Sequence, residues 1–488
     1  MAAPLKGPKP RMRLFLVNPP RVEGYAVVRE ERFEHKDIGS VYPPLSLLYC
    51  AAVAERGGHQ VRLVDANGFD LKLDAVLAEM DAFKPDVVLI RLGFDTQESD
   101  LAVLRAARER GARTFVRCKI VGDVPWLVES FMAEHPFVDG FFLDEPEFLL
   151  PTALRLLPQG LQALRGAPGL LLNLSEGLVR TDDPGRMPDP DELPKPAYHL
   201  LPSLGVYHTG VLDAPFTVVQ TSRGCPYTCS FCSFGKLPWR ARKIETVLEE
   251  LAWLKADFGV RRFLFFDDVL TLDMGRTVKL CEGMLAAGLD MEWVCCTRAN
   301  AVSKELLALM KKAGCREIAF GIESGSDRVL AETDKGVSKD QMRRAARWCH
   351  EVGILFYGLA IIGLPGEDAA SVQDTLDFIN EIEPFYSQFS FCTPFPNTDT
   401  YAWFKSRGLL RTEDWKEYFP LAARPVIRTQ ALDEAALVRQ RRRLYWGVLV
   451  RPRKLLRALR PGDWRHNWTG FKKVLGRVSL LLQGGAVR

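Results

Sequence analysis

TSRGCPYTCSFCSFGK, residues 221–236, is the stretch that decides the fold and the chemistry of this chain. Its three cysteines, Cys225, Cys229 and Cys232, follow the spacing C-x3-C-x2-C. Thiolates are soft ligands that suit zinc or iron–sulfur clusters, and three of them within eight residues can bind adjacent corners of one small site. The stretch contains no fourth cysteine and no histidine. A closed zinc site would therefore need a distant ligand, whereas a four-iron cluster with three protein ligands leaves one iron open to substrate.

The sequence on both sides of this loop has strand and helix signals. Residues 216–220 are β-branched and aromatic, which predicts a strand, and residues 244–258 have the apolar periodicity of an amphipathic helix. The cysteines therefore lie on a loop that leaves the C-terminal end of a strand, where α/β folds place their active sites. A zinc knuckle or scattered core cysteines are the alternative, but the ligand spacing in this context favours a cluster.

In this setting CPYTCSFC, residues 225–232, resembles the cluster loop of the radical S-adenosylmethionine (SAM) enzymes. In that family the unique iron of a 4Fe-4S cluster is chelated by the amino and carboxylate groups of SAM. The resemblance implies that Cys225, Cys229 and Cys232 are the metal ligands and catalytic residues, and that SAM is cleaved reductively to a 5′-deoxyadenosyl radical. It also implies a low-potential electron donor such as flavodoxin or ferredoxin.

The composition is that of a globular protein in a reducing compartment. The chain has 488 residues, of which 47% are hydrophobic and 26% charged, so it is long enough for two to four domains. The chain has eleven cysteines, an odd number that does not suit the disulfide framework of a secreted protein. The early apolar run at residues 14–17 is too short for a signal peptide. No uncharged apolar run reaches 18 residues. We therefore expect a cytoplasmic protein with no membrane-spanning segment.

The N-terminal part, residues 1–157, predicts an α/β domain with a doubly wound parallel sheet. Short apolar runs typical of buried strands occur at residues 14–17, 61–64, 87–90, 114–116 and 137–143. Helical periodicity fills the intervals at residues 45–55, 71–83, 101–109 and 126–134. A Rossmann-like sheet of this kind binds ligands outside the C-terminal ends of its strands. The loops expected there are residues 18–20, 65–68, 121–123 and 144–147.

This domain resembles the cobalamin-binding domain that precedes the radical domain in many radical SAM enzymes. The matching segments are NPP at 18–20, VYPPLSLLYCAA at 41–52, GGHQVRLVDA at 57–66, PDVVLI at 85–90 and DEPE at 144–147. The resemblance implies cobalamin contacts from Asn18, Tyr42, Gly122 and Glu145.

Two features depart from the relatives' pattern. The D-x-H-x-x-G loop that supplies a histidine to cobalt in some cobalamin proteins is absent from the chain. The Gly-Gly-Pro-His turn of many relatives is Gly-Asp-Val-Pro here, at residues 122–125. The alternative to cobalamin binding is therefore the same fold kept as a scaffold or substrate platform.

Residues 158–212 contain eight prolines and the polar run TDDPGRMPDPDELP at 181–194. Proline lacks a backbone N–H, so this density argues against a long helix or a central strand. We expect an extended surface linker that separates two domains.

Residues 213–400 predict a second α/β domain. Strands are expected at residues 217–220, 263–266, 293–296, 318–322, 355–362 and 388–392. Helices are expected between them at residues 244–258, 275–287, 304–312, 339–351 and 371–381. Six strands with five intervening helices predict a partial (β/α)6 TIM-like barrel that is open on one side, which suits a large substrate.

Polar or glycine-rich residues follow the strands of this predicted barrel. Asp267 and Asp268 follow the second strand, Arg298 follows the third, and GIESGS (321–326) and IGLPGE (362–367) follow the fourth and fifth. Because these strand ends converge on one mouth, together they indicate an active site. Helix capping is the alternative for the acidic pair.

The radical SAM resemblance assigns roles to these residues. It implies that Asp267 and Asp268 hold the SAM ammonium and that Arg298 and Glu323 hold its carboxylate or ribose. It also implies that Phe231 and the fifth-strand glycine turn flank the adenine. Acids suit an ammonium, an arginine fork suits a carboxylate, and glycines allow the backbone to approach a nucleoside.

The C-terminal part, residues 401–488, predicts a basic helical extension. Residues 439–488 contain fourteen Arg or Lys and one acid, Asp463, so this segment has a net charge of +13. The whole chain has a net charge of +4, so the other 438 residues have a net charge of −9. Basic amphipathic helices with Trp and Tyr are typical of a membrane surface, and a helix docked on the acidic body is the alternative. Nucleic-acid binding is the weakest interpretation because no RNA-binding module accompanies the charge.

Methylation of an unactivated carbon, with cobalamin passing the methyl group from SAM, is the leading activity that the resemblance implies. Alternatives are a cobalamin-linked ring closure or oxidation without methyl transfer, and a radical SAM enzyme whose first domain no longer binds cobalamin. An RNA-modifying methylthiotransferase would need a second cluster and an RNA-binding domain, neither of which the sequence indicates. The expected substrate is a small or lipid-like molecule.

Overall fold

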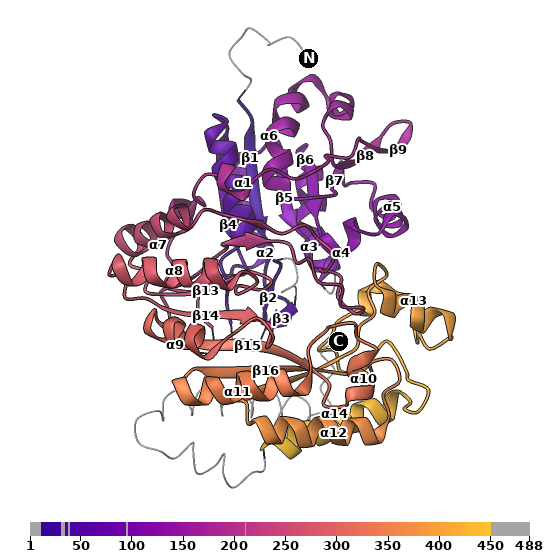
Figure 1. The fold of residues 1–488 in the computed structure, drawn as a ribbon. Coiled ribbons are helices and arrows are strands. Elements are labelled where there is room, and N and C mark those ends of the chain that lie inside the picture. Colours follow the sequence, from indigo (N-terminus) through magenta and orange to yellow (C-terminus); the bar gives the residue numbers. More distant parts are fainter. Residues whose placement is uncertain (1–10, 31–34, 38–39, 94–95, 210, 450–488) are drawn as a thin grey trace. The chain divides into compact units, whose positions relative to one another are not determined.

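The structure, a computed structural model, describes residues 11–30, 35–37, 40–93, 96–209 and 211–449. The chain forms two compact units, Met1–Val206 and Tyr207–Arg488 (Figure 1).

The first unit is built on a seven-stranded sheet within the described residues, with the order β4-β1-β5-β6-β7-β8-β9. The strands are β1 (Arg13–Asn18), β4 (Gln60–Asp65), β5 (Val87–Arg91), β6 (Arg113–Arg117), β7 (Gly140–Phe142), β8 (Leu170–Leu174) and β9 (Gly177–Arg180). The five strands from β4 to β7 are parallel, which confirms the predicted doubly wound sheet. Continuous apolar runs such as residues 14–17 form the central strands because both faces of the sheet are buried.

Helices flank this sheet: α1 (Leu45–Arg56), α2 (Leu73–Phe83), α3 (Gln97–Glu109), α4 (Lys119–Gly122), α5 (Pro125–Glu134) and α6 (Pro146–Leu156). A small hairpin joins β2 (Ala26–Val28) and β3 (His35–Asp37), and short 3-10 turns occur at η2 (Leu157–Gln159), η3 (Leu161–Gly166), η4 (Pro190–Glu192) and η5 (Tyr198–Leu200). Two of these helices were not predicted. The expected loop 121–123 lies at the end of α4, and the expected loop 144–147 runs into α6, which begins at Pro146 because proline suits the first helical turn.

The proline-rich segment 158–212 is not extended throughout, contrary to the prediction. Strand β8 lies between β7 and β9, and both of its pairings are antiparallel. The prediction that this segment contains no central strand is wrong because Pro168 and Pro184 flank the two strands rather than interrupt them, so the ladder keeps its N–H donors.

The second unit is built on six parallel strands in sequential order within the described residues. They are β10 (Phe216–Val219), β13 (Arg262–Phe265), β14 (Glu292–Thr297), β15 (Cys315–Glu323), β16 (Leu355–Ile362) and β17 (Tyr386–Phe391). The helices are α7 (Ile244–Phe258), α8 (Met274–Ala286), α9 (Lys304–Lys312), α10 (Asp327–Ala331), α11 (Lys339–Val352) and α12 (Ala369–Ile382). Sequential order is the arrangement of a barrel, so the predicted partial (β/α)6 barrel is confirmed (Figure 1).

The two faces of the barrel sheet differ in exposure. On β16, Phe356, Ala360 and Ile362 are buried under the helices, whereas the alternate residues Tyr357 and Leu359 are half-buried. The same alternation continues along β17. The inner face is therefore partly accessible, as expected for a face that receives ligands.

The C-terminal part covers the edge strand β17. It contains α13 (Asp399–Ser406), η6 (Trp415–Glu417) and α14 (Glu434–Leu449). The backbone N–H of Phe389 donates to the Tyr445 hydroxyl (3.3 Å), and that of Phe391 donates to the Pro420 carbonyl (2.8 Å). The edge therefore has partners for these two donors.

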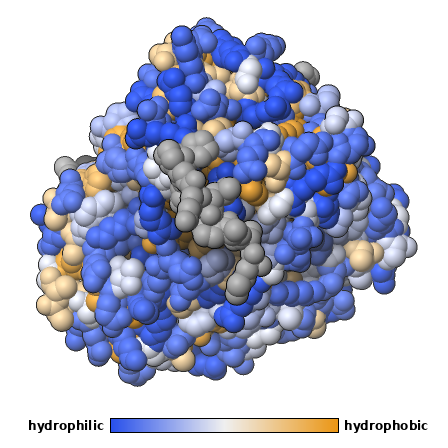
Figure 2. All heavy atoms as spheres, turned by 90° about the horizontal axis from the view of Figure 1, so that it is seen from above, coloured by the Kyte–Doolittle hydropathy of each residue, from blue (hydrophilic) through white to orange (hydrophobic). Residues whose placement is uncertain are grey.

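The part of the predicted basic extension within α14 follows the docked-helix alternative. Leu437, Leu444 and Val448 are buried on one face of α14, which packs against α12 and β17. Residues 471–482 of the same extension, whose apolar residues also repeat at helical spacing, lie outside the described residues. None of the described helices is long and apolar enough to cross a bilayer. The face in Figure 2 is mainly hydrophilic, with hydrophobic residues in small separate groups.

Arg441 provides a test of the docking of α14. Its guanidinium is buried, donates to the carbonyls of Ala422 (2.8 Å) and Ala423 (3.3 Å), and lies 3.8 Å from the Phe391 ring centroid. Burial lowers its pKa to about 10. We expect Arg441→Ala to reduce the unfolding free energy of the second unit by roughly 2–4 kcal/mol. The substitution removes side-chain packing and leaves the Ala422 and Ala423 carbonyls without this hydrogen-bond donor. Denaturant unfolding measures this, and the exposed neighbour Arg442→Ala is the control. Equal stability of both variants would contradict the docking.

Candidate functional site

The loop of three cysteines is held in a closed form by its own backbone. The N–H of Leu237 donates to the Cys225 carbonyl (2.9 Å), and the N–H of Lys236 donates to the Tyr227 carbonyl (2.9 Å). Gly224 has φ +84°, and a Cβ there would overlap the Pro238 carbonyl, so the close approach of the returning strand requires glycine. The loop is thus a compact turn closed by backbone hydrogen bonds rather than an extended loop.

The three thiols differ in burial from most other cysteines. Cys225, Cys229 and Cys232 are half-buried, whereas Cys281, Cys295 and their neighbours in the barrel core are buried. Cys281, Cys295 and Cys315 are thus core residues of the barrel, whereas Cys296 is half-buried. Burial raises the pKa of Cys281 to about 12, which keeps that thiol protonated and a poor ligand.

Donors point at two of the loop sulfurs. Arg298 Nη1 lies 3.4 Å from Cys229 Sγ, and the N–H of Phe234 lies 3.4 Å from Cys232 Sγ. Hydrogen bonds to the ligand sulfurs are typical of iron–sulfur clusters. In the described part of the chain, no group of three His, Cys, Asp or Glu side chains is arranged to hold a single metal ion. Three accessible thiols with these donors suit a cluster in which each cysteine binds its own iron.

Two later segments brace the loop from outside. The N–H of Ser230 donates to the Thr333 carbonyl (2.9 Å), and Thr228 Oγ1 donates to Asp334 (2.8 Å). On the other side, the N–H of Thr400 donates to the Ser230 carbonyl (3.0 Å). The second brace comes from Thr400 near the start of α13, so the beginning of this helix helps to position the loop.

Asp267 fixes the start of the loop. Its carboxylate is fully buried and accepts from the Thr221 N–H (2.7 Å), the Thr221 hydroxyl (2.6 Å) and the Ser222 hydroxyl (2.6 Å). Burial raises the pKa of Asp267, and these hydrogen bonds oppose the rise. Asp268, the next residue, is half-buried. Their predicted contact with the SAM ammonium stays a prediction, and the described contacts of Asp267 make it an anchor of the loop.

Arg298 lies between the loop and the fourth strand. Its guanidinium stacks 3.6 Å from the Tyr227 ring centroid and donates to the Lys335 carbonyl. Glu323, at the end of β15, forms a buried ion pair with Lys335. The structure thus links the two predicted residues through Lys335, which sequence reasoning missed. Lys335 lies in the loop after α10 and does not follow a predicted strand, so no sequence pattern marks it as a site residue. Only the tertiary contacts show that it lies beside Glu323 and Arg298.

The fifth strand ends in a tight acidic turn. Gly363 and Gly366 have φ +86° and +74°, and the Gly363 N–H donates to the Glu367 carboxyl, which is 2% exposed. The Cys392 N–H donates to the Ile362 carbonyl (2.7 Å), which joins the ends of the fifth and sixth strands. Phe231, predicted to flank adenine with this turn, is half-buried on the cysteine loop.

In the first unit, Asn18 belongs to a buried network at the strand ends. Its amide donates to Asp65 (2.7 Å) and accepts from Arg29 (3.3 Å), whose guanidinium also forms a two-point contact with Asp100. These contacts connect the ends of β1 and β4 to α3.

The other predicted cobalamin contacts lie at or near this edge of the sheet. Tyr42 is half-buried before α1, and Glu145 is the residue before α6. Gly122 lies in α4 after β6, where a Cβ would lie 2.8 Å from Arg117 Nη1. Gly122 therefore lies close to side chains of its own unit, and its cobalamin contact stays a prediction.

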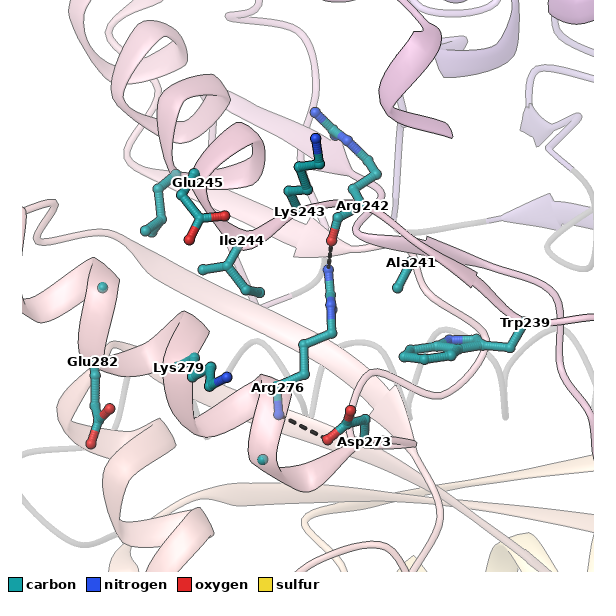
Figure 3. Close-up of a pocket in the computed structure, with 13 residues that line it drawn as sticks. Trp239, Ala241, Arg242, Lys243, Ile244, Glu245, Asp273, Arg276, Lys279 and Glu282 are labelled. Carbon is teal, nitrogen blue, oxygen red and sulfur yellow. Dashed lines mark hydrogen bonds between the residues drawn. The ribbon is translucent and has the colours of Figure 1, made fainter. Parts of the chain in front are cut away.

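A cavity of about 770 Å³ lies in the second unit beside the loop exit (Figure 3). It is lined by Trp239, Ala241, Arg242, Lys243, Ile244, Glu245, Leu248, Asp273, Gly275, Arg276, Lys279, Glu282 and Gly283. Arg276 reaches across it to the Arg242 carbonyl (2.8 Å) and donates to Thr221 Oγ1 (2.9 Å). The cavity contains none of the predicted site residues, and its wall supports the same Thr221 that Asp267 holds.

Comparisons with known proteins agree with this geometry. The family model described as the radical SAM superfamily matches residues 219–379. An uncharacterized methyltransferase of Pyrococcus horikoshii is 31% identical over 455 residues, which cover 92% of this chain and 95% of that protein. The anaerobic magnesium-protoporphyrin IX monomethyl ester cyclase of Rubrivivax gelatinosus is 24% identical over 420 residues, which cover 82% and 73%.

Two solved structures have a similar fold. OxsB, a cobalamin-dependent SAM radical enzyme solved with aqua-cobalamin and SAM, has a TM-score of 0.72 at 17% identity and covers 96% of this chain and 72% of its own. The radical SAM methyltransferase TsrM of Kitasatospora setae, solved with cobalamin and a 4Fe-4S cluster, has a TM-score of 0.64 at 20% identity and covers 81% and 75%.

Glu367 predicts a pH dependence of stability. Burial raises its pKa from 4.5 to about 8, so the folded chain holds this proton more tightly than the unfolded chain. The stabilisation is therefore present below about pH 4.5 and is lost as pH rises through about 8. We expect the wild type to lose thermal stability between pH 6 and pH 8.5 relative to Glu367→Gln, which cannot titrate. Thermal unfolding at both pH values measures this, with the exposed Glu249→Gln as the control. Parallel profiles for the wild type and Glu367→Gln would contradict the assignment.

Proposed function

This chain belongs to the radical SAM superfamily, in the family that carries an N-terminal cobalamin-binding-type domain, and we propose that it is a cobalamin-dependent C-methyltransferase. The observation that carries the proposal is the C-x3-C-x2-C loop at the first strand end of an open barrel, in a chain 31% identical over nearly its full length to a methyltransferase. When bound, the cluster and SAM supply reductive cleavage to a 5′-deoxyadenosyl radical. The substrate is a small molecule.

The residues of the second unit have separate tasks in this proposal. Cys225, Cys229 and Cys232 would hold the cluster. Arg298 offers a guanidinium fork to the SAM carboxylate, and Glu323 offers acceptors to the ribose hydroxyls. Phe231 and the turn at residues 362–367 would enclose the adenine, since glycines allow backbone approach.

The first unit would hold the corrinoid at the strand ends that carry Asn18, Tyr42, Gly122 and Glu145. A parallel sheet binds its ligand at this edge, which supports the proposal. The corrinoid would supply a transferable methyl group, and the protein would supply orientation and exclusion of water.

Ring closure or oxidation without methyl transfer is the second candidate, favoured by the likeness to the cyclase of Rubrivivax gelatinosus. Both candidates use the same cluster loop, so the site alone does not separate them. The products do, because only methyl transfer moves a labelled methyl group from SAM.

We also propose two partners. A low-potential flavodoxin or ferredoxin in the cytoplasm would reduce the cluster. An anionic lipid surface would bind the C-terminal part, because Arg439, Arg442 and Trp446 are exposed on the face of α14 opposite its packed face, and Trp446 is 43% exposed. Tryptophan and arginine together suit a lipid headgroup region.

The test of methyl transfer supplies methyl-deuterated SAM, a chemical reductant and hydroxocobalamin to the anaerobically reconstituted protein with an extract that contains its substrate. We expect a product heavier by one labelled methyl group, together with S-adenosylhomocysteine and 5′-deoxyadenosine. Formation of 5′-deoxyadenosine with only an unlabelled cyclised or dehydrogenated product would replace methyl transfer with the second candidate.

Substitution of a cluster cysteine tests the radical chemistry itself. We expect Cys229→Ala to abolish the iron–sulfur absorbance and 5′-deoxyadenosine formation while thermal stability changes little, because this loop residue is half-buried. The core variant Cys281→Ala is the control and should keep the cluster. A Cys229→Ala protein that cleaves SAM at the wild-type rate would end the radical SAM assignment.

Vesicle binding tests the lipid contact. We expect removal of residues 450–488, combined with Trp446→Ala, to weaken binding to anionic vesicles severalfold and to reduce its salt dependence. Each Lys or Arg near an anionic surface contributes ~1 kcal/mol, and salt screens it. This deletion spares Arg441 and Tyr445, which pack on β17. Equal binding by both proteins, or equal binding to neutral vesicles, would contradict the proposal.

A further inference from the structure

Glu323 occupies an unfavourable backbone conformation at the end of β15. Its φ is +59°, and the pairing of β15 with β16 shifts register between Gly321 and Glu323. A left-handed residue other than glycine costs on the order of 1–3 kcal/mol and persists only where its surroundings hold it. The carboxylate therefore needs a partner that fixes its direction.

Lys335 is that partner. Its ammonium donates to the Glu323 carboxylate and to the Gly321 carbonyl (2.7 Å), and the two side chains are 7% and 9% exposed. A Cβ at residue 321 would overlap both the ammonium and the carboxylate. The first glycine of GIESGS is thus required by the ion pair.

The same residue also holds Arg298. The Lys335 carbonyl accepts from Arg298 Nη2, and the other Arg298 nitrogen, Nη1, lies 3.4 Å from Cys229 Sγ. A continuous chain of contacts therefore runs from Glu323 through Lys335 and Arg298 to the cysteine loop.

The segment that carries Lys335 is anchored on both sides. Thr333 and Asp334 accept hydrogen bonds from the cysteine loop, and the Gly336 carbonyl accepts from Asn300 (3.3 Å). Asp334 and Gly336, on either side of Lys335, both have positive φ. The backbone around Lys335 is therefore a fixed turn that aims its ammonium into the strand end.

We propose that Lys335 is a positioning residue of the SAM site, which sets the direction of Glu323 through its ammonium and of Arg298 through its carbonyl. The proposal rests on the proposed function, since it takes Glu323 and Arg298 to contact SAM. Without the ammonium, the buried carboxylate of Glu323 has lost its counterion and turns away from this direction. The cluster ligands lie on the other side of Arg298 and are unaffected.

The experiment measures SAM affinity by equilibrium binding to the reconstituted 4Fe-4S protein under anaerobic conditions. We expect Lys335→Met to weaken SAM binding at least tenfold at wild-type iron and sulfide content, and Lys335→Arg to restore much of the loss. The SAM-induced change in the electron paramagnetic resonance of the reduced cluster should weaken in Lys335→Met. Lys339→Met, which removes a lysine four residues away that pairs with Asp327, is the matched control.

A double-mutant cycle with Glu323→Gln separates positioning from direct contact. If Lys335 acts through Glu323, Lys335→Met has little further effect on SAM affinity in the Glu323→Gln background. Additive losses would assign Lys335 a contact of its own with SAM and overturn the positioning role. Loss of iron from Lys335→Met, or wild-type affinity, would also overturn it.

A second readout avoids SAM and the cluster altogether. Hydrogen exchange in the cluster-free protein should show faster exchange at residues 320–324 in Lys335→Met than in Lys339→Met. Equal exchange would contradict the ion-pair restraint. A wild-type protein that binds neither cluster nor SAM would instead refute the proposed function, so the two failures are distinguishable.

Discussion

The carboxylate of Asp267 is the contact on which the geometry of the cysteine loop depends. Strands β10 and β13 are neighbours, with Val219 opposite Phe265, so a residue just past one strand end reaches the chain just past the other. Asp267 uses this position to accept three hydrogen bonds from Thr221 and Ser222. A buried polar group without a hydrogen-bond partner costs roughly 1–3 kcal/mol or more. The folded chain therefore keeps Thr221 and Ser222 directed at Asp267. The loop consequently leaves the barrel in one direction.

Buried ion pairs at other strand ends also hold polar side chains in fixed directions. The Lys335–Glu323 pair in the second unit and the Arg29–Asp100 pair in the first are both nearly inaccessible to water. Such pairs add little net stability because desolvation offsets their attraction, but removal of one partner is strongly destabilising. Their value here is geometric: they hold polar groups in fixed directions at edges where α/β folds bind ligands. The same pairing leaves Asn18 engaged within the protein, so a ligand at that edge meets a preformed network.

The strands and main helices of both units were predictable from the sequence, because each is a short apolar run or an amphipathic period separated by Gly, Pro or polar residues. The failures have local causes. Helix α4 has four residues, too few for a period, and β8 lies in a proline-rich segment whose prolines happen to flank it. The sequence of α14 is compatible with a membrane surface or a docked helix, since an apolar face is common to both. Only the packing of Tyr445 and Arg441 against β17 shows that one face of this helix is docked.

The sequence by itself determined the C-x3-C-x2-C triad of cysteines, the family resemblance and the strand ends that carry polar residues, because residue spacing and periodicity are local properties of the chain. The tertiary structure decided which of those residues are engaged by the protein itself. It turned Asp267 toward the loop, placed Arg298 between Cys229 and Tyr227, and brought Lys335 from a distant loop to Glu323. Such pairings form between strands and loops that are far apart in the sequence. The local sequence around a side chain therefore does not show which residue it contacts.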